Sequence, residues 1–118
     1  MIESGALGTL LAFTGALDAA SAAKIEPGLL AGVAKHPAPW IIDLRGVTFV
    51  CSTTMGMLVR VATLHAQTNH STVLLVGGGA VEQAIRAARL DSLFRLAHSL
   101  ELARDAARLP PLDGRGRR

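Results

Sequence analysis

The segment WIIDLRGVTFVCSTTMGM, residues 40–57, contains the pattern that decides the fold. Residues 40–44 form an apolar run of the kind found in strands that are buried on both faces. Gly46 is expected to turn the chain into a second, short β-branched segment at residues 47–50. A helix is predicted from about residue 52 to residue 67, because apolar side chains recur there at helical spacing. Its apolar side carries Met55, Leu58, Ala62 and His65.

Strands and helices alternate on both sides of this segment. A strand (9–14) and a helix (18–35) are predicted before it. Pro27 lies within that helix, so either the helix kinks there or its regular part begins late, with Pro27 in the first turn. The elements predicted after the segment are a strand at 72–76, a helix at 80–88, a short strand at 93–96 and a helix capped by Ser99 and running to about residue 108. The alternation predicts an α/β fold, with helices packed on a mixed or mostly parallel central sheet.

Length and composition fit one small globular domain. The chain has 118 residues, of which 50% are hydrophobic and 18% charged. That is ample apolar material for one core and too little chain for two independent domains. We assign residues 1–108 to the domain and residues 109–118 to a disordered basic tail, since two prolines end the last helix and the residues after them are mostly Gly and Arg.

The charge pattern and the apolar runs exclude several classes of protein. The formal net charge is +3, and three arginines against one aspartate place +2 of it in the last ten residues. A nucleic-acid binder usually spreads Lys and Arg over a folded face with aromatic rings for stacking. The apolar runs are shorter than the roughly 18 residues of a membrane span, and no basic segment precedes the first of them. We expect a cytoplasmic protein with no direct nucleic-acid binding and no membrane insertion.

Cys51 is the only cysteine and the first candidate for chemistry. It lies just before a predicted helix N-terminus, where the helix dipole lowers the pKa of a thiol, so a small enzyme with a Cys51 nucleophile is one interpretation. A cysteine phosphatase loop needs an arginine six positions later, where the chain has Met57, and a dithiol centre needs a second cysteine. A small, partly buried residue at the strand-to-helix junction is the simpler interpretation.

The other candidate motifs are also better explained by structure than by chemistry. Residues 77–79 are three glycines between a strand and a helix, but a dinucleotide fingerprint requires a further glycine where the chain has Glu82. The four histidines lie in different predicted elements, with no pair at metal-ligand spacing. Asp18 and Asp91 lie at helix or turn starts, where carboxylates accept from backbone N–H groups. The sequence therefore predicts no metal, no cofactor and no catalytic residue.

Three hydroxyl side chains, Ser52, Thr53 and Thr54, come directly after Cys51. One or two such side chains are explained by capping of the unpaired N–H groups of a helix N-terminus, and three in a row exceed that need. A phosphoryl group on one of them would lie at the positive end of the helix and would add about two negative charges to the surface. This pattern is typical of a switch that a protein partner reads.

Residues 41–58, IIDLRGVTFVCSTTMGML, resemble the hallmark of the STAS domain, the sulphate transporter and anti-sigma factor antagonist family, which reads close to VVLDLSGVTFLDSSGLGVLL. Further segments are similar to family motifs in the expected order over about residues 9–107. They are GALD at 15–18, LLVG at 74–77, LDSLF at 90–94 and SL at 99–100. The resemblance implies a small domain with a mixed sheet, helices mainly on one face and a non-enzymatic, regulatory role.

The antagonists of this family bind an anti-sigma factor, often a protein kinase with a histidine-kinase-like ATPase fold, and so free a sigma factor. Phosphorylation of a Ser or Thr in their D-S-S-G motif abolishes binding. Carried over by position, the second motif serine is Thr53 and the first is Ser52. The chain departs from the motif at Cys51, which replaces its aspartate, and at Thr54, which replaces its first glycine, whereas Gly56 is retained.

The resemblance implies that the segment of residues 51–57 binds the anti-sigma factor. The expected contact residues are Cys51, Ser52, Thr53, Thr54 and Met57, with Thr53 and Ser52 as phosphorylation sites and Met55 in the core. The alternative is a cytoplasmic STAS subunit of a lipid-trafficking ABC transporter that binds its ATPase, because such subunits often carry degenerate phosphorylation motifs. Self-association into a homodimer is left open.

Overall fold

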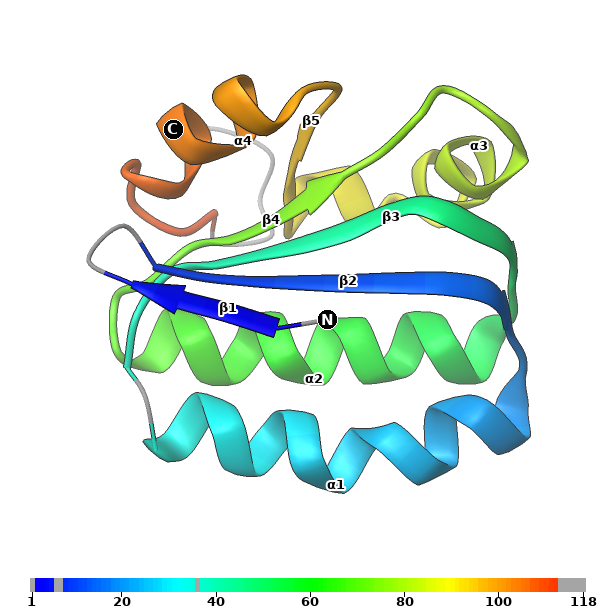
Figure 1. Ribbon diagram of the computed structural model, residues 1–118, viewed down its shortest axis with the longest axis horizontal. Coiled ribbons are helices and arrows are strands. Elements are labelled where there is room, and N and C mark those ends of the chain that lie inside the picture. Colours follow the sequence, from blue (N-terminus) through cyan, green and yellow to red (C-terminus); the bar gives the residue numbers. More distant parts are fainter. Residues whose placement is uncertain (1, 6–7, 36, 113–118) are drawn as a thin grey trace.

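The computed structural model of the protein describes residues 2–5, 8–35 and 37–112. Its strands form one sheet in the order β1-β2-β3-β4-β5 (Figure 1). They are β1 (Ile2–Gly5), β2 (Gly8–Leu17), β3 (Trp40–Val50), β4 (Thr72–Leu75) and β5 (Arg95–Ala97). Strands β2 to β5 are parallel, and β1 pairs antiparallel with β2 at the edge. The predicted α/β fold with a mixed sheet is confirmed.

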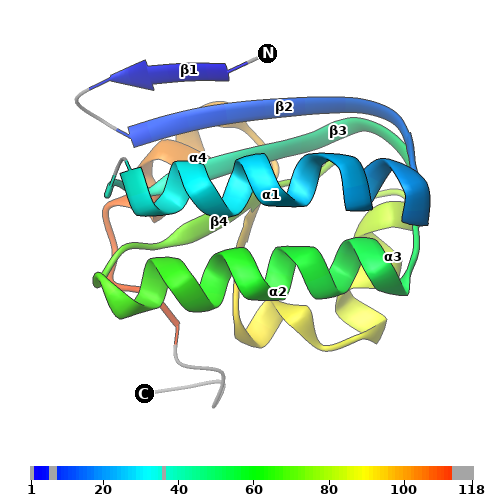
Figure 2. The ribbon, with the colours of Figure 1, turned by 90° about the horizontal axis from the view of Figure 1, so that it is seen from below.

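The helices cover both faces of this sheet unequally. They are α1 (Ala19–Lys35), α2 (Ser52–Gln67), α3 (Ala80–Ala87) and α4 (Leu100–Ala107), with a short 3₁₀ turn η1 (Leu90–Ser92). Helices α1 and α2 run side by side across one face, and α4 lies on the other side (Figures 1 and 2). Both α1 and α2 begin where a parallel strand ends, so their N-termini lie at the same edge of the sheet.

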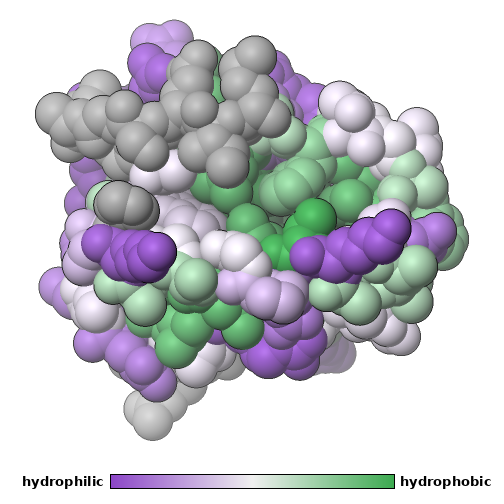
Figure 3. Space-filling model, turned by 60° about the horizontal axis from the view of Figure 1, so that its bottom comes forward, coloured by the Kyte–Doolittle hydropathy of each residue, from purple (hydrophilic) through white to green (hydrophobic). Residues whose placement is uncertain are grey.

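The core consists of two apolar clusters separated by the sheet. Side chains alternate along β3, so that Trp40, Ile42 and Leu44 join the larger cluster under α1 and α2. Ile41 belongs to the smaller cluster, with Val73 and other residues of β4, β5 and α4. Burial on both faces agrees with the apolar run at residues 40–44. On one face of the molecule, apolar surface gathers in a hollow flanked by polar side chains (Figure 3).

Strand β3 differs from the prediction because it does not turn at Gly46. The strand continues to Val50, and a register irregularity lies where Gly46 pairs with Thr14 of β2. A Cβ atom at Gly46 would lie 2.9 Å from the Thr14 Cγ2 atom and 3.4 Å from the Phe13 carbonyl oxygen. Glycine is therefore required here for close approach of two strands, and not for a turn.

Other boundaries also differ from the predicted ones. Helix α1 begins at Ala19 and continues through Pro27, so a late helix start is excluded. The final strand lies at Arg95–Ala97 and not at 93–96, because Leu93 is the C-cap residue of η1. Strand β1 has no counterpart in the prediction. The Ser99 cap is confirmed, since its side chain accepts from the Leu102 N–H at 3.1 Å.

The segment after α4 packs against the domain. The Ser71 hydroxyl donates to the Leu109 carbonyl oxygen, and the Arg95 guanidinium donates to the Pro110 carbonyl oxygen at 2.9 Å. Two residues of the predicted tail, Leu109 and Pro110, are thus hydrogen-bonded to side chains at the beginnings of β4 and β5. Residues 113–118 of that tail lie outside the described residues.

Candidate functional site

The junction between β3 and α2 is formed by Cys51, which is the N-cap residue of the helix. Its backbone is extended, with φ −125° and ψ 178°, and its carbonyl oxygen accepts from the Met55 N–H at 3.0 Å. The thiol makes no capping hydrogen bond. Its Sγ atom lies 3.5 Å from the Thr54 hydroxyl oxygen and 3.9 Å from the Leu17 carbonyl oxygen. Cys51 is thus a partly buried residue at the junction.

The pKa of the Cys51 thiol is lowered, as the sequence predicts. The neighbouring Thr54 hydroxyl is the main cause, followed by the backbone N–H of Thr54 and then that of Thr53. The same N–H groups are the ones left without helical partners at the start of α2, so this end of the helix favours negative charge.

Thr54 and Met57 point into the protein. Neither has any exposed surface, and the Thr54 hydroxyl donates to the Leu17 carbonyl oxygen at the end of β2. Met57 packs in the larger apolar cluster. The expectation that these two side chains contact a partner is therefore wrong: Thr54 ties α2 to the neighbouring strand, and Met57 is part of the core, while Met55 is only partly buried against it.

Ser52 and Thr53 are the exposed hydroxyl residues of the junction. They occupy the first two positions of the sixteen-residue helix α2. Phe49, two residues before Cys51, is also exposed, with half of its surface open to solvent, and it pairs with Ala16 of β2. The sequence did not indicate Phe49, because a strand that continues past Gly46 was not expected. The exposed residues in the stretch of chain from 49 to 54 are therefore Phe49, Ser52 and Thr53.

An ion pair joins α1 and α2 close to this junction. The Arg60 guanidinium of α2 donates to both carboxylate oxygens of Glu26 on α1, with one of these bonds at 2.8 Å. The hydrogen bond from Arg60 lowers the pKa of Glu26, and Glu26 raises the pKa of Arg60. The residues are 34 positions apart, so no local sequence signal predicts the pair.

A pocket of about 330 Å³ opens at the carboxyl ends of β3 and β4. Arg45 and Glu82 are among its lining residues, together with Gly77 and Gly79 of the glycine turn. The Arg45 guanidinium is already paired with Asp43 at 3.0 Å. Gly78 has φ +85°, a left-handed conformation that suits glycine and explains the turn into α3.

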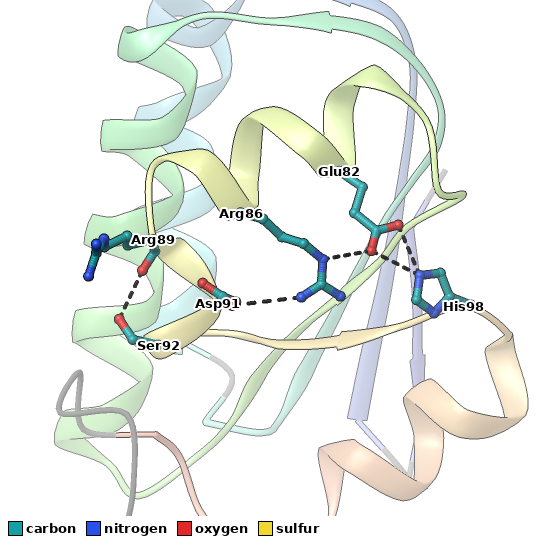
Figure 4. Close-up of polar contacts among 6 residues, drawn as sticks. All are labelled: Glu82, Arg86, Arg89, Asp91, Ser92 and His98. Atoms are coloured by element: carbon teal, nitrogen blue, oxygen red, sulfur yellow. Dashed lines mark hydrogen bonds and ion pairs between the residues drawn. The ribbon is translucent and has the colours of Figure 1, made fainter.

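Glu82 is buried in the wall of this pocket and has two partners (Figure 4). Its carboxylate lies 2.9 Å from Arg86 Nε and 2.9 Å from His98 Nε2, and Arg86 extends the network to Asp91 at 3.7 Å. Burial alone would raise the pKa of Glu82, but the hydrogen bonds from His98 and Arg86 lower it. The carboxylate lies near the glycine turn, and Glu82 occupies the position at which a dinucleotide-binding fingerprint requires a glycine.

The histidines of the described part of the chain lie in different surroundings. His65 is buried beside Trp40, whereas His98 contacts Glu82 of α3. His36 lies outside the described residues. Nowhere in residues 2–5, 8–35 and 37–112 do three His, Cys, Asp or Glu side chains form a group able to hold a metal ion. Within the same residues, no helix combines the length and the apolar character needed to cross a membrane.

The fold and this junction define a small α/β domain that exposes hydroxyls at a helix start. A STAS domain model matches residues 2–103, and the chain belongs to the STAS domain family. The predicted resemblance over about residues 9–107 is thereby confirmed. No curated protein matches the chain.

Two solved structures resemble this one. An anti-sigma factor antagonist from Mycobacterium paratuberculosis has a TM-score of 0.81 and 26% sequence identity, covering 92% of each chain. A protein from Shewanella loihica with a SpoIIAA-like fold, from the DUF3478 family, has a TM-score of 0.57 and 18% identity, covering 91% of this chain and 90% of that one. The second likeness concerns the fold alone.

Proposed function

We propose that the protein is an anti-sigma factor antagonist that binds its partner through the exposed part of the β3–α2 junction. The observation that carries this proposal is the exposure of Ser52 and Thr53 at the N-terminus of α2. The likeness to the Mycobacterium paratuberculosis antagonist supports it. Contact falls to Cys51, Ser52, Thr53 and Phe49, since the side chains of Thr54 and Met57 are buried. The role requires no catalytic group, metal or cofactor.

The proposed switch is phosphorylation of Thr53, with Ser52 as the second acceptor. A kinase transfers the γ-phosphoryl group of ATP to the Thr53 hydroxyl oxygen, so that a P–O bond forms, the hydroxyl proton is released and ADP leaves. The product carries about two additional negative charges at the contact surface. The fold tolerates them at this helix end, and a partner surface matched to a neutral hydroxyl does not.

Pull-down from the native lysate, with bound proteins identified by mass spectrometry, tests the binding role. We expect an anti-sigma factor to be recovered by the wild type and lost with Thr53→Glu. Thr63→Glu is the matched control: Thr63 is an exposed threonine of the same helix, and its hydroxyl donates to the Val59 carbonyl oxygen at 2.9 Å. Equal recovery with Thr53→Glu would reject the junction as the contact surface.

The alternative partner is the ATPase of a lipid-trafficking ABC transporter. The observation in its favour is Cys51, which stands where the antagonist motif has an aspartate and changes the charge beside Thr53. Recovery of transporter components without an anti-sigma factor would establish this alternative. Intact-mass analysis after incubation with the recovered kinase and ATP tests the switch: we expect added phosphate on the wild type, no phosphate on Thr53→Ala if Thr53 is the acceptor, and retained phosphate on Thr53→Ala if Ser52 accepts it instead. A wild type without added phosphate would reject the switch.

A further inference from the structure

The side chain of Arg60 lies over Gly56, a residue that is one turn closer than Arg60 to the start of α2. A Cβ atom at Gly56 would lie 3.4 Å from Arg60 Nη1 and 4.0 Å from Arg60 Cζ. Long side chains in helices point toward the N-terminus, which explains this direction. Because position 56 has no side chain, the surface between Thr53 and the guanidinium is clear of intervening atoms from that residue.

Thr53, Gly56 and Arg60 lie on one side of α2. Positions three, four and seven apart in a helix share a face, and the Cβ atoms of residues three apart are roughly 5–6 Å from each other. The guanidinium over Gly56 is therefore about one helical turn from Thr53. Both end residues are exposed: Thr53 belongs to the solvent-facing junction, and slightly more than half of the Arg60 side chain is open to solvent.

Arg60 is at present neutralised by Glu26. The pair is bidentate, and the Glu26 side chain is only 19% exposed, so the contact also holds α1 against α2. A phosphate dianion carries more charge than a carboxylate and offers three acceptor oxygens, which makes it the stronger partner for a guanidinium.

We propose that a phosphate on Thr53 draws Arg60 away from Glu26 and pairs with it over Gly56. This inference rests on the proposed function, in which Thr53 is the modified residue. The exchange converts a local neutral pair into a phosphate–arginine pair and a free carboxylate on α1. Phosphorylation thereby alters two surfaces, the junction and the Glu26 region of α1, and a partner that contacts α1 senses the modification at a distance from Thr53.

The test needs phosphothreonine at position 53 and no kinase. Cys51 is the only cysteine and lies two residues before Thr53, so the whole chain can be assembled by native ligation of residues 1–50 to a synthetic segment of residues 51–118. The ³¹P chemical shift of the product, measured as a function of pH, gives the second pKa of the phosphate, which is about 6 for a free phosphothreonine. A nearby guanidinium favours the dianion and so lowers this pKa.

We expect the phosphate pKa to rise by about half a unit in Arg60→Gln, the size expected for a solvent-exposed charge pair at roughly 4 Å. It should fall in Glu26→Gln, which frees Arg60, and return toward the wild-type value in Arg60→Lys. Arg86→Gln, an arginine paired with Glu82 on α3, is the control and leaves it unchanged. Asp18, just before the start of α1, accepts from the Ser21 N–H and is present in every variant.

An unchanged phosphate pKa in both Arg60→Gln and Glu26→Gln would overturn the exchange. Since the phosphate is introduced chemically, this result would not bear on the proposed partner binding or on the proposed phosphorylation by a kinase. Conversely, absence of phosphorylation in the lysate would reject the switch without changing the measured pKa values. Melting curves of the unphosphorylated variants confirm that each one folds.

Discussion

His65 makes the stability of this domain depend on pH between about 6.5 and 4. Its imidazole has no exposed surface, and Nδ1 lies 2.7 Å from the Thr72 hydroxyl oxygen. The Nε2 atom is buried without a hydrogen-bond partner among the described residues. Burial, and then repulsion from His70, lower the pKa of His65 from 6.5 to about 4. A proton added at Nε2 would therefore have no acceptor.

The sign is set by the difference in pKa between the two states. The unfolded chain binds a proton at His65 below pH 6.5, whereas the folded protein does so only near pH 4, so stability is present above pH 6.5 and is lost as the pH falls. At 1.36 kcal/mol for each pKa unit, the full loss is about 3 kcal/mol, of which about 2 kcal/mol appears by pH 5. This is a large share of the roughly 5–15 kcal/mol that stabilises a domain.

Urea unfolding at pH 7.5, 6 and 5 measures this loss, with Trp40 as the fluorescent reporter. Trp40 is the only tryptophan, and its ring centroid is 4.7 Å from that of His65. His65→Asn keeps a hydrogen-bonding atom near Thr72 and does not titrate, so its stability should be lower at pH 7.5 but nearly flat down to pH 5. His70→Asn should retain most of the wild-type loss. The same loss in wild type and His65→Asn would refute the reasoning.

Further changes test the packing in the same unfolding assay or by thermal melting. Gly46→Ala should lower the free energy of unfolding by about 1–3 kcal/mol, because its Cβ atom overlaps with Thr14. Gly28→Ala in α1 should raise it by up to about 1 kcal/mol, because a Cβ atom there meets nothing within 4 Å. A lower stability of Gly28→Ala would contradict this expectation. Cys51→Ser should add about 0.5–1 kcal/mol by supplying the missing N-cap acceptor, and an unchanged midpoint would show that the thiol already fills that role. Ending the chain at Arg108 should lower the melting temperature by several degrees relative to ending it at Leu112, since only the shorter chain loses the contacts of Ser71 and Arg95; equal temperatures would mean that these contacts add no stability.

Elements with a clear repeat were predictable from the sequence. Helix α2 has the predicted bounds, because a sixteen-residue apolar pattern with hydroxyls at its start indicates a helix and no other structure. The sequence predicts that strand β3 ends before Gly46, because it shows the glycine but not the neighbouring strand that requires a glycine there. The exposure of Phe49 depends on that same strand continuing. Contacts between distant residues, such as Glu26 with Arg60, come from helix packing and have no local signal.

The departures from the family motif make structural sense at this junction. A glycine after the second hydroxyl leaves the helix start without a side chain there, whereas Thr54 fills the position and bonds to the end of β2. This bond fixes the first turn of α2 to the end of β2. The side chain of the N-cap residue Cys51 makes no capping hydrogen bond that would do the same. One turn of helix therefore divides its hydroxyls between two roles: Thr54 fixes the backbone, and Ser52 and Thr53 remain on the surface.

This division predicts that Thr54→Val destabilises the fold by about 1–3 kcal/mol, because it removes the α2 hydroxyl that donates to the buried Leu17 carbonyl oxygen. Thr53→Val should leave the unfolding midpoint nearly unchanged and remove the proposed phosphate acceptor. Equal destabilisation by the two substitutions would show that the hydroxyls are not divided in this way.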